Sequence, residues 1–187
     1  GRTEFLTELD GISAKQNKLD LSPLLKTATP HPGKAVYCTE SSNPAFDKGL
    51  LNKELLAQAQ PYIEAKQGKT FYFDIRNTDR SVGAMLSGAI ADVHGDQGMA
   101  ADPIKAHFSG TAGQSFGVWN AGGVELTLTG DANDYVGKGM AGGSIAVRPP
   151  IGSAFRSHEA SIVGNTCLYG ATGGKLFAAG RAGERFA

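Results

Sequence analysis

The sequence has little cysteine, no excess of charge and no long apolar run. Its 187 residues contain only Cys38 and Cys167, with no CxxC spacing and no histidine spaced to complete a zinc site. We therefore predict two reduced, buried thiols. Eighteen basic and eighteen acidic residues cancel, and no basic run is present, which argues against nucleic acid and anionic membranes as partners. No stretch approaches the roughly 20 apolar residues that cross a bilayer.

The beginning of the chain lacks the signals of export. Residues 1–4 do not start the basic, apolar and small-residue order of a signal peptide, so we expect a cytoplasmic protein. The chain also begins without methionine and in mid-pattern, which suggests a piece excised from a larger protein. Its length permits one sizeable hydrophobic core without disulfides.

Glycine usage divides the chain into two regions. Seventeen of the 26 glycines lie between Gly110 and Gly183. We interpret residues 1–68 as a linker-like segment with short helices, separated by a loop rich in proline, asparagine and serine. We interpret residues 69–187 as a domain built from glycine-containing repeats.

Three elements are predicted ahead of the repeats. A helix after Asn52 would be ended by Gly68, and its apolar face is Leu55, Leu56, Ala59 and Ile63. Pro61 weakens this prediction because proline removes a helical hydrogen bond. Residues 69–75 are β-branched and aromatic, which predicts a strand. A second helix, stopped by Gly95, has the apolar stripe Val82, Met85, Leu86, Ala89, Ile90 and Val93. We interpret this helix as an end cap for the repeats.

The decisive pattern is an internal repeat of twenty residues. Residues 110–123 align without gaps on residues 130–143, and a β-rich run follows each glycine pair. Residues 164–174 form a shorter third copy, after an insertion that contains Pro149, Pro150 and Gly152. Short strands that stack in parallel and in register predict a mainly β fold, a parallel β-helix or single-stranded solenoid with an N-terminal helical capping and linker region. We expect an interior stack of large side chains from Phe116, Val136 and Tyr169.

Several sequence patterns resemble ligand sites but lack the required context. Residues 137–142 fit GxGxxG, yet a β-like run that ends in two prolines follows them instead of a helix. Residues 173–175 lack the first glycine and the hydroxyl of a phosphate loop. Residues 131–134 resemble a calcium loop without its turn glycine and its final glutamate, so we interpret them as turn-stabilising. Residues 92–96 we interpret as a solvated helix end.

Two further hypotheses concern charged side chains. Arg156, His158 and Glu159 lie in the insertion, where we interpret them as a docking contact to neighbouring domains in preference to an acid–base pair. A β-helix enzyme that acts on polysaccharide would need charged groups in phase on successive repeats, and Glu125 and Arg148 do not repeat in phase. We predict no catalytic, cofactor-binding or metal-binding residue in this chain.

The motifs together resemble a known family. Residues 73–83, 113–125, 130–143 and 158–174 are similar to the C-terminal glycine-repeat (GXGXG) domain of glutamate synthase large subunits, and the similarity extends to residues 29–35. The repeats alone also resemble, more distantly, the glycine-repeat subunit of formylmethanofuran dehydrogenases. That second resemblance leaves open a stand-alone β-helix interaction scaffold.

The glutamate synthase resemblance implies a domain of an enzyme that makes glutamate from glutamine and 2-oxoglutarate in ammonia assimilation. In that family an N-terminal cysteine attacks glutamine, and a barrel domain holds FMN and an iron–sulfur cluster, reduced by NADPH or ferredoxin. This chain begins with Gly1 and has too few cysteines for the cluster. The resemblance therefore implies a non-catalytic spacer, folded as a right-handed parallel β-helix.

The resemblance also implies partners. They are the amidotransferase and FMN-binding synthase domains of the same polypeptide, with the small subunit as a further candidate. The repeats stop at Ala187 where the family continues, so we expect the fragment to self-associate or fray at that end.

Overall fold

The computed structural model describes residues 20, 22–26, 29–42 and 49–187. The chain divides into two compact units, Gly1–Phe46 and Asp47–Ala187. In the first unit the described elements comprise one short helix, α1 (Ser22–Leu25). Much of the predicted linker-like segment lies outside the described residues. No helix of the described part is long and apolar enough to cross a membrane.

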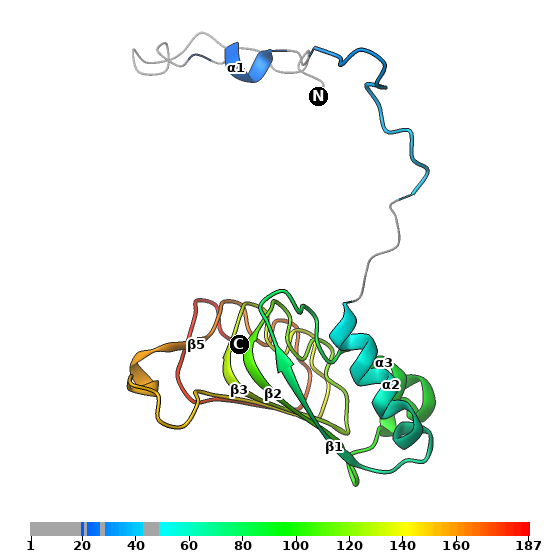
Figure 1. Ribbon diagram of the computed structural model, residues 1–187, viewed down its shortest axis with the longest axis vertical. Coiled ribbons are helices and arrows are strands. Elements are labelled where there is room, and N and C mark those ends of the chain that lie inside the picture. Colours follow the sequence, from blue (N-terminus) through cyan, green and yellow to red (C-terminus); the bar gives the residue numbers. More distant parts are fainter. Residues whose placement is uncertain (1–19, 21, 27–28, 43–48) are drawn as a thin grey trace. The chain divides into compact units, whose positions relative to one another are not determined.

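The second unit begins with helix α2 (Leu50–Glu64), which packs against a later helix, α3 (Ala84–His94) (Figure 1). Three residues of the predicted face of α2, Leu55, Ala59 and Ile63, are fully buried, and the fourth, Leu56, is partly buried. The helix contains Pro61 and is capped at Ala65, before the predicted stop at Gly68.

Helix α3 is shorter than predicted and its buried stripe is narrower. Leu86 and Ile90 are buried, whereas Val93 is 45% exposed. The ring Nε2 of His94 contacts the carbonyl oxygen of Ile63 at 2.7 Å, which joins the end of α3 to α2. A short 3-10 helix, η3 (Gly95–Gln97), follows.

The rest of the unit is built on a parallel sheet. Its main strand order is β1-β2-β3-β4-β6, with β5 and β7 paired at the side. The strands are β1 (Lys69–Ile75), β2 (Ile104–Ala112), β3 (Val124–Ala132), β4 (Ser144–Arg148), β5 (Ser161–Val163), β6 (Lys175–Ala178) and β7 (Arg181–Ala182). Strand β1 has the predicted bounds.

Strand pairing reproduces the twenty-residue period. From Ile104↔Val124 to Ala112↔Ala132, each residue of β2 pairs with the residue twenty positions later in β3. Strand β4 pairs with the first half of β3 one residue short of this period, since Glu125↔Ser144 are nineteen positions apart, and β5 meets the end of β3 through Ala132↔Val163. The insertion therefore interrupts what is one continuous strand in the preceding repeat.

Alternate strand residues form the core. One row runs across four strands as Phe73, Phe108, Leu128 and Val147. The rings of Phe73 and Phe108 stack at 5.8 Å between centroids, and Phe116 packs edge-on against Phe108 at 5.4 Å. Because the strands are in register, similar apolar side chains stack on one another without leaving space between repeats.

Each strand is followed by a segment that returns the chain to the start of the next strand. In this return segment the backbone takes a positive φ at every second residue: Ser115, Gly117 and Trp119 in one repeat, Tyr135, Gly137 and Gly139 in the next. The amides bond to neighbouring repeats, as in Ser115 to the Asp134 carbonyl at 2.8 Å and Gly117 to the Val82 carbonyl at 2.9 Å. The return segments are thus hydrogen-bonded between repeats without being strands.

The fold class predicted from the sequence is wrong. The structure is an α/β arrangement, an open parallel sheet with helices, and not a mainly β closed β-helix. The physical reason is the return segment. Alternation of positive and negative φ curls this half of each repeat, so it cannot extend into the further strands that a β-helix requires.

The predicted interior stack is confirmed in part. Phe116 and Val136 are fully buried, but Tyr169 is 63% exposed. Cys167 is the buried residue of the third copy, because the insertion shifts that copy to an offset of 31 residues, as in Ala132↔Val163. The residue equivalent to Val136 is therefore Cys167, and the prediction of Tyr169 is wrong by two residues.

Glycine is required most strictly where two strands approach at Gly110 and Gly130. A Cβ on Gly130 would overlap the carbonyl oxygen of Gly110, and Gly130 has a φ of +151°. We expect Gly130→Ala to lower the free energy of unfolding by about 2–4 kcal/mol, from overlap and backbone strain together.

The matched control is Gly88→Ala, since Gly88 is exposed in α3 and has no atom near its Cβ position. Here we expect a gain of about 0.5–1 kcal/mol from helix propensity. Both values come from urea unfolding of the purified chain. Equal stability of the two variants would contradict the close approach between the strands.

Candidate functional site

The insertion between β4 and β5 is the most distinctive surface feature of the second unit. Residues 149–160 leave the sheet after Arg148 and return at Ser161, and Figure 1 shows this loop, in orange, projecting beyond the strands. The loop contains a short 3-10 helix, η4 (Ser157–Glu159). The interruption of a strand position makes this loop the candidate functional site.

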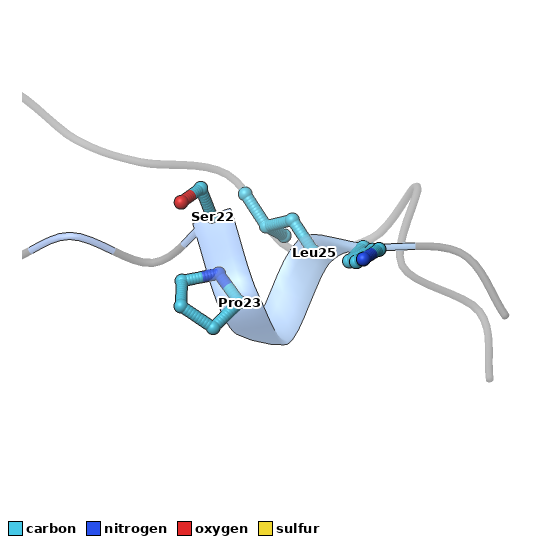
Figure 2. A pocket seen from close by; sticks show the side chains of 4 residues that line it. Ser22, Pro23 and Leu25 are labelled. Atoms are coloured by element: carbon cyan, nitrogen blue, oxygen red, sulfur yellow. The ribbon is translucent and has the colours of Figure 1, made fainter.

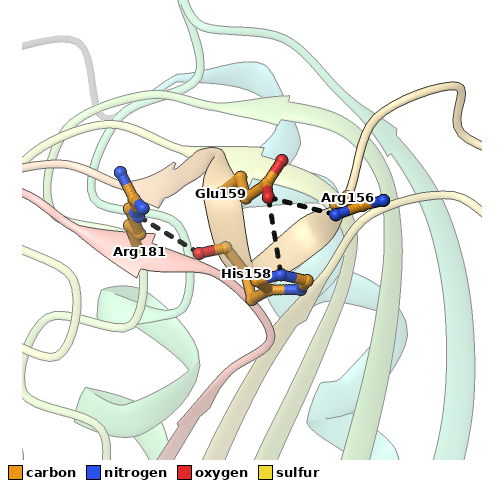
Figure 3. Close-up of polar contacts among 4 residues, drawn as sticks. All are labelled: Arg156, His158, Glu159 and Arg181. Atoms are coloured by element: carbon orange, nitrogen blue, oxygen red, sulfur yellow. Dashed lines mark hydrogen bonds and ion pairs between the residues drawn. The ribbon is translucent and has the colours of Figure 1, made fainter.

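Local contacts hold the loop in one conformation. The Ser153 hydroxyl donates to the Pro150 carbonyl at 2.7 Å, which closes the turn after the two prolines. At the other end, Arg181 Nε of β7 donates to the His158 carbonyl oxygen at 3.1 Å (Figure 3). The bond from β7 uses a backbone acceptor of the loop, so it does not occupy the side chain of His158.

The predicted charged residues come together on this loop. Arg156 and Glu159 approach to 3.5 Å, and His158 Nε2 lies 3.8 Å from the same Glu159 oxygen (Figure 3). All three side chains are more than half exposed, and such surface pairs contribute little to stability. Ile151 is 97% exposed on the same loop. The loop thus presents charge and apolar surface together.

A shallow groove lies between the loop and the sheet. Its lining comes from β2, β3, β5 and the loop: Ser109, Gly110, Thr111, Thr129, Gly130, Asp131, Pro149, Pro150, Phe155, Ala160, Ser161 and Ile162. Asp131 is the one titratable side chain of this lining, and it accepts a hydrogen bond from Thr111 Oγ1 at 2.8 Å. A lone, already bonded carboxylate cannot provide the paired groups of acid–base catalysis.

The two glycine-rich motifs lie in return segments. Residues 137–142 lead into β4, and residues 173–174 lead directly into β6. Neither opens a helix, so neither has the helix N-terminus on which a dinucleotide or phosphate loop depends. In the first motif, glycine serves the positive φ of Gly137 and Gly139.

The Asx residues after β3 connect repeats to one another. Asn133 Nδ2 donates to the side-chain oxygen of Asn77 at 2.9 Å, and the Asp134 carboxylate accepts the Asn165 amide at 2.7 Å. Asn165 in turn accepts the Glu184 amide at 2.7 Å. These side chains bind backbone and amide groups of adjacent turns, in keeping with the turn-stabilising interpretation.

The remaining charged candidates lie apart from one another. His94 contacts α2, while Asp92 and Asp96 are exposed. Glu125 pairs with Lys105 at 3.5 Å on the outer face of the sheet, and Arg148 is exposed at the end of β4. Within the described part of the chain, no three His, Cys, Asp or Glu side chains are grouped as metal ligands.

The two cysteines differ. Cys167 is buried, as predicted, and burial raises the pKa of its thiol above the ordinary value, which keeps it protonated and unreactive. Cys38 is exposed, so the prediction of two buried thiols is wrong for this residue.

In the same unit as Cys38, a surface hollow on α1 is lined by Ser22, Pro23, Leu25 and Lys26 (Figure 2). A single turn of helix with one cation offers no combination of groups for chemistry.

Sequence reasoning missed one cluster. Trp119, Tyr135, Lys138 and Tyr169 lie close together on successive return segments, where Lys138 Nζ lies over both tyrosine rings. The signal was available in the repeat alignment, because Trp119 occupies the position that Gly139 fills twenty residues later. Leu168 likewise stands where earlier repeats have Gly117 and Gly137, but it packs against the core, whereas Trp119 is exposed.

A family model described as "GXGXG motif" matches residues 52–187, which include most of α2, all of α3 and all seven strands. The match thus covers the helices as well as the repeats. It covers well over half of the chain.

Curated relatives match along the entire chain. A glutamate synthase [NADH] of Schizosaccharomyces pombe is 44% identical over 100% of this chain and 9% of its own length. The glutamate synthase [NADPH] large chain of Azospirillum brasilense is 42% identical over 100% of this chain and 12% of its own length. The chloroplastic ferredoxin-dependent glutamate synthase 2 of Arabidopsis thaliana is 43% identical over 100% of this chain and 11% of its own length.

The chain spans about a tenth of the length of these relatives. The resemblance noted from the motifs is therefore confirmed at the level of the domain. The chain belongs to the GXGXG motif family, and it corresponds to the GXGXG region of glutamate synthase large subunits.

Proposed function

We propose that this chain is the structural spacer domain of a glutamate synthase, the enzyme that makes glutamate from glutamine and 2-oxoglutarate in ammonia assimilation. One observation carries the proposal: the chain matches NADH-, NADPH- and ferredoxin-named relatives along its entire length at 42–44% identity. Because the region is so similar in enzymes named for different electron donors, it does not determine the specificity for the donor. Its contribution is one that all of them share.

The architecture supports a mechanical contribution. Both the strands and the return segments are hydrogen-bonded from repeat to repeat, and the interior is filled by stacked apolar rows. Bending such a unit would break hydrogen bonds between repeats both in the sheet and in the return segments. A rigid body of this kind can keep two other domains at a fixed separation.

Catalytic chemistry is assigned by this proposal to the other parts of the enzyme. These are the amidotransferase domain and the synthase domain that binds FMN and an iron–sulfur cluster, with NADPH, NADH or ferredoxin as the source of electrons. The small subunit and self-association through the free edge of β6 are further proposed contacts. We also propose that the enzyme is cytoplasmic.

The alternative of a stand-alone scaffold has less support. A likeness to the glycine-repeat subunit of formylmethanofuran dehydrogenases would involve the repeats alone. The matches to glutamate synthases extend over the entire chain, including the residues ahead of β1. The glutamate synthase assignment accounts for more of the sequence.

The proposal is tested by assaying the isolated chain for glutamine hydrolysis and recording its absorption between 350 and 500 nm, roughly the range of bound flavin. We expect neither activity nor a flavin spectrum, because the described residues provide no nucleophile–base pair. The full-length polypeptide is the positive control. Glutaminase activity or bound flavin in the isolated chain would refute the spacer role.

The loop hypothesis predicts an effect in the full-length enzyme only. Arg156→Gln, His158→Gln and Glu159→Gln combined should weaken domain packing and reduce glutamate formed per glutamine hydrolysed. The melting temperature of the isolated chain should not change, because these side chains are exposed and Arg181 binds a backbone oxygen. Lys175→Gln, an exposed charge on β6, is the control. Unchanged assembly and coupling would dismiss the docking role of the loop.

A further inference from the structure

Trp119 has a backbone conformation that favours glycine. Its φ is +55°, and the equivalent positions in the next two repeats are Gly139 at +63° and Gly170 at +67°. An L-residue with a side chain is strained there, whereas glycine is not. Glycine therefore satisfies the backbone at this position. Other side chains also occur at positive φ in the return segments, as at Tyr135 and Leu168, so it is the exposure of the tryptophan that needs an explanation.

The indole ring does not fill the core. Trp119 is the one tryptophan of the chain and is 63% exposed. Its ring lies on the backbone of Gly139, where an added Cβ would come within 2.6 Å of the indole Cδ1. Because Gly139 has no side chain, the indole of Trp119 can pack directly on the backbone there while it remains exposed at the surface.

A cation and two more aromatic rings adjoin this indole. Lys138 Nζ lies 5.5 Å from the centroid of Tyr135 and 6.0 Å from that of Tyr169, which is also 63% exposed. The backbone amide of Trp119 donates to the Lys138 carbonyl at 2.8 Å, and that of Gly139 donates to the Tyr169 carbonyl at 2.8 Å. These bonds place Trp119, Tyr135, Lys138 and Tyr169 in one cluster, which we call the aromatic patch.

The charge of the aromatic patch is not neutralised within the described residues. Lys138 is absent from the ion pairs of this part of the chain, which involve Glu125 and Glu159 as acids. Cation–π contacts orient the ammonium group but leave its charge uncompensated. A surface that covers the patch would have to supply a carboxylate, because a buried cation without a counter-charge is costly.

We propose that the aromatic patch is where a neighbouring domain of the same polypeptide docks. The docking segment places an apolar side chain against Trp119 and an aspartate or glutamate at Lys138. Tryptophan and tyrosine are the residue types that dominate binding energy at interfaces. The proposal rests on the proposed function, since about nine-tenths of each relative lies outside the region matched by this chain.

Hydroxyl-radical labelling tests the proposal directly. The labelling rate of Trp119 is measured by mass spectrometry in the isolated chain and in the full-length polypeptide. Docking predicts a rate several-fold lower in the full-length polypeptide. An equal rate in both would overturn the proposal. Protection in the isolated chain that grows with protein concentration would also overturn it, because the occupant would then be a second copy.

Substitutions separate docking from a structural role. In the full-length polypeptide, Trp119→Gly should speed proteolytic release of the domain, and Lys138→Glu should do so more than Lys138→Gln. Tyr72→Ala, which removes another exposed aromatic ring on β1, is the matched control and should have a smaller effect. In the isolated chain, Trp119→Gly should leave the melting temperature unchanged or raised. A lowered melting temperature would show that the indole stabilises the domain itself and would overturn the proposal.

The two proposals fail in different ways. If Trp119 is exposed in the full-length polypeptide and the isolated domain is inactive, the docking proposal is refuted and the spacer role is retained. Glutaminase activity in the isolated chain would remove the spacer role whatever the labelling of Trp119.

Discussion

The structure depends on parallel hydrogen bonding between successive repeats of the chain. The bonding is not confined to the sheet, because the return segments carry amides that bond to the repeats before and after, as Ser115 does to Asp134 and Gly137 to Phe116. Alternate positive φ values turn successive amides toward different neighbours, and glycine supplies many of these conformations at little cost. Each repeat is therefore stable only between others.

This architecture explains which polar side chains stabilise the fold and where contacts can form. Polar side chains at the turns, such as Asn133, Asp134 and Asn165, are bonded to adjacent repeats and contribute to the stack itself. The exposed groups singled out above lie on the insertion loop and on the aromatic patch. Both interrupt the repeat pattern, one by added residues and the other by a tryptophan in a glycine position. Departures from a structural repeat are where a spacer domain can carry specific contacts.

Much of the local structure follows from the sequence. The strand at Lys69–Ile75, the buried face of α2 and the register of β2 on β3 could be predicted because each depends on residues close in sequence or on a visible period. The overall fold class could not be predicted from the sequence. A glycine-rich segment with alternating φ and one with extended strands share the same composition, and their difference lies in backbone angles that composition does not specify. The predicted burial of Tyr169 is wrong for a related reason, since the insertion hides the true offset of the third copy.

The central claim is that the return segments bond the repeats together as the strands do. Amide hydrogen exchange, resolved residue by residue, tests it most directly. The account predicts that Ser115, Gly117 and Trp119, with their equivalents Tyr135, Gly137 and Gly139, exchange as slowly as the amides of β2 and β3. Exchange at these amides as fast as in the loop of residues 149–160 would contradict it.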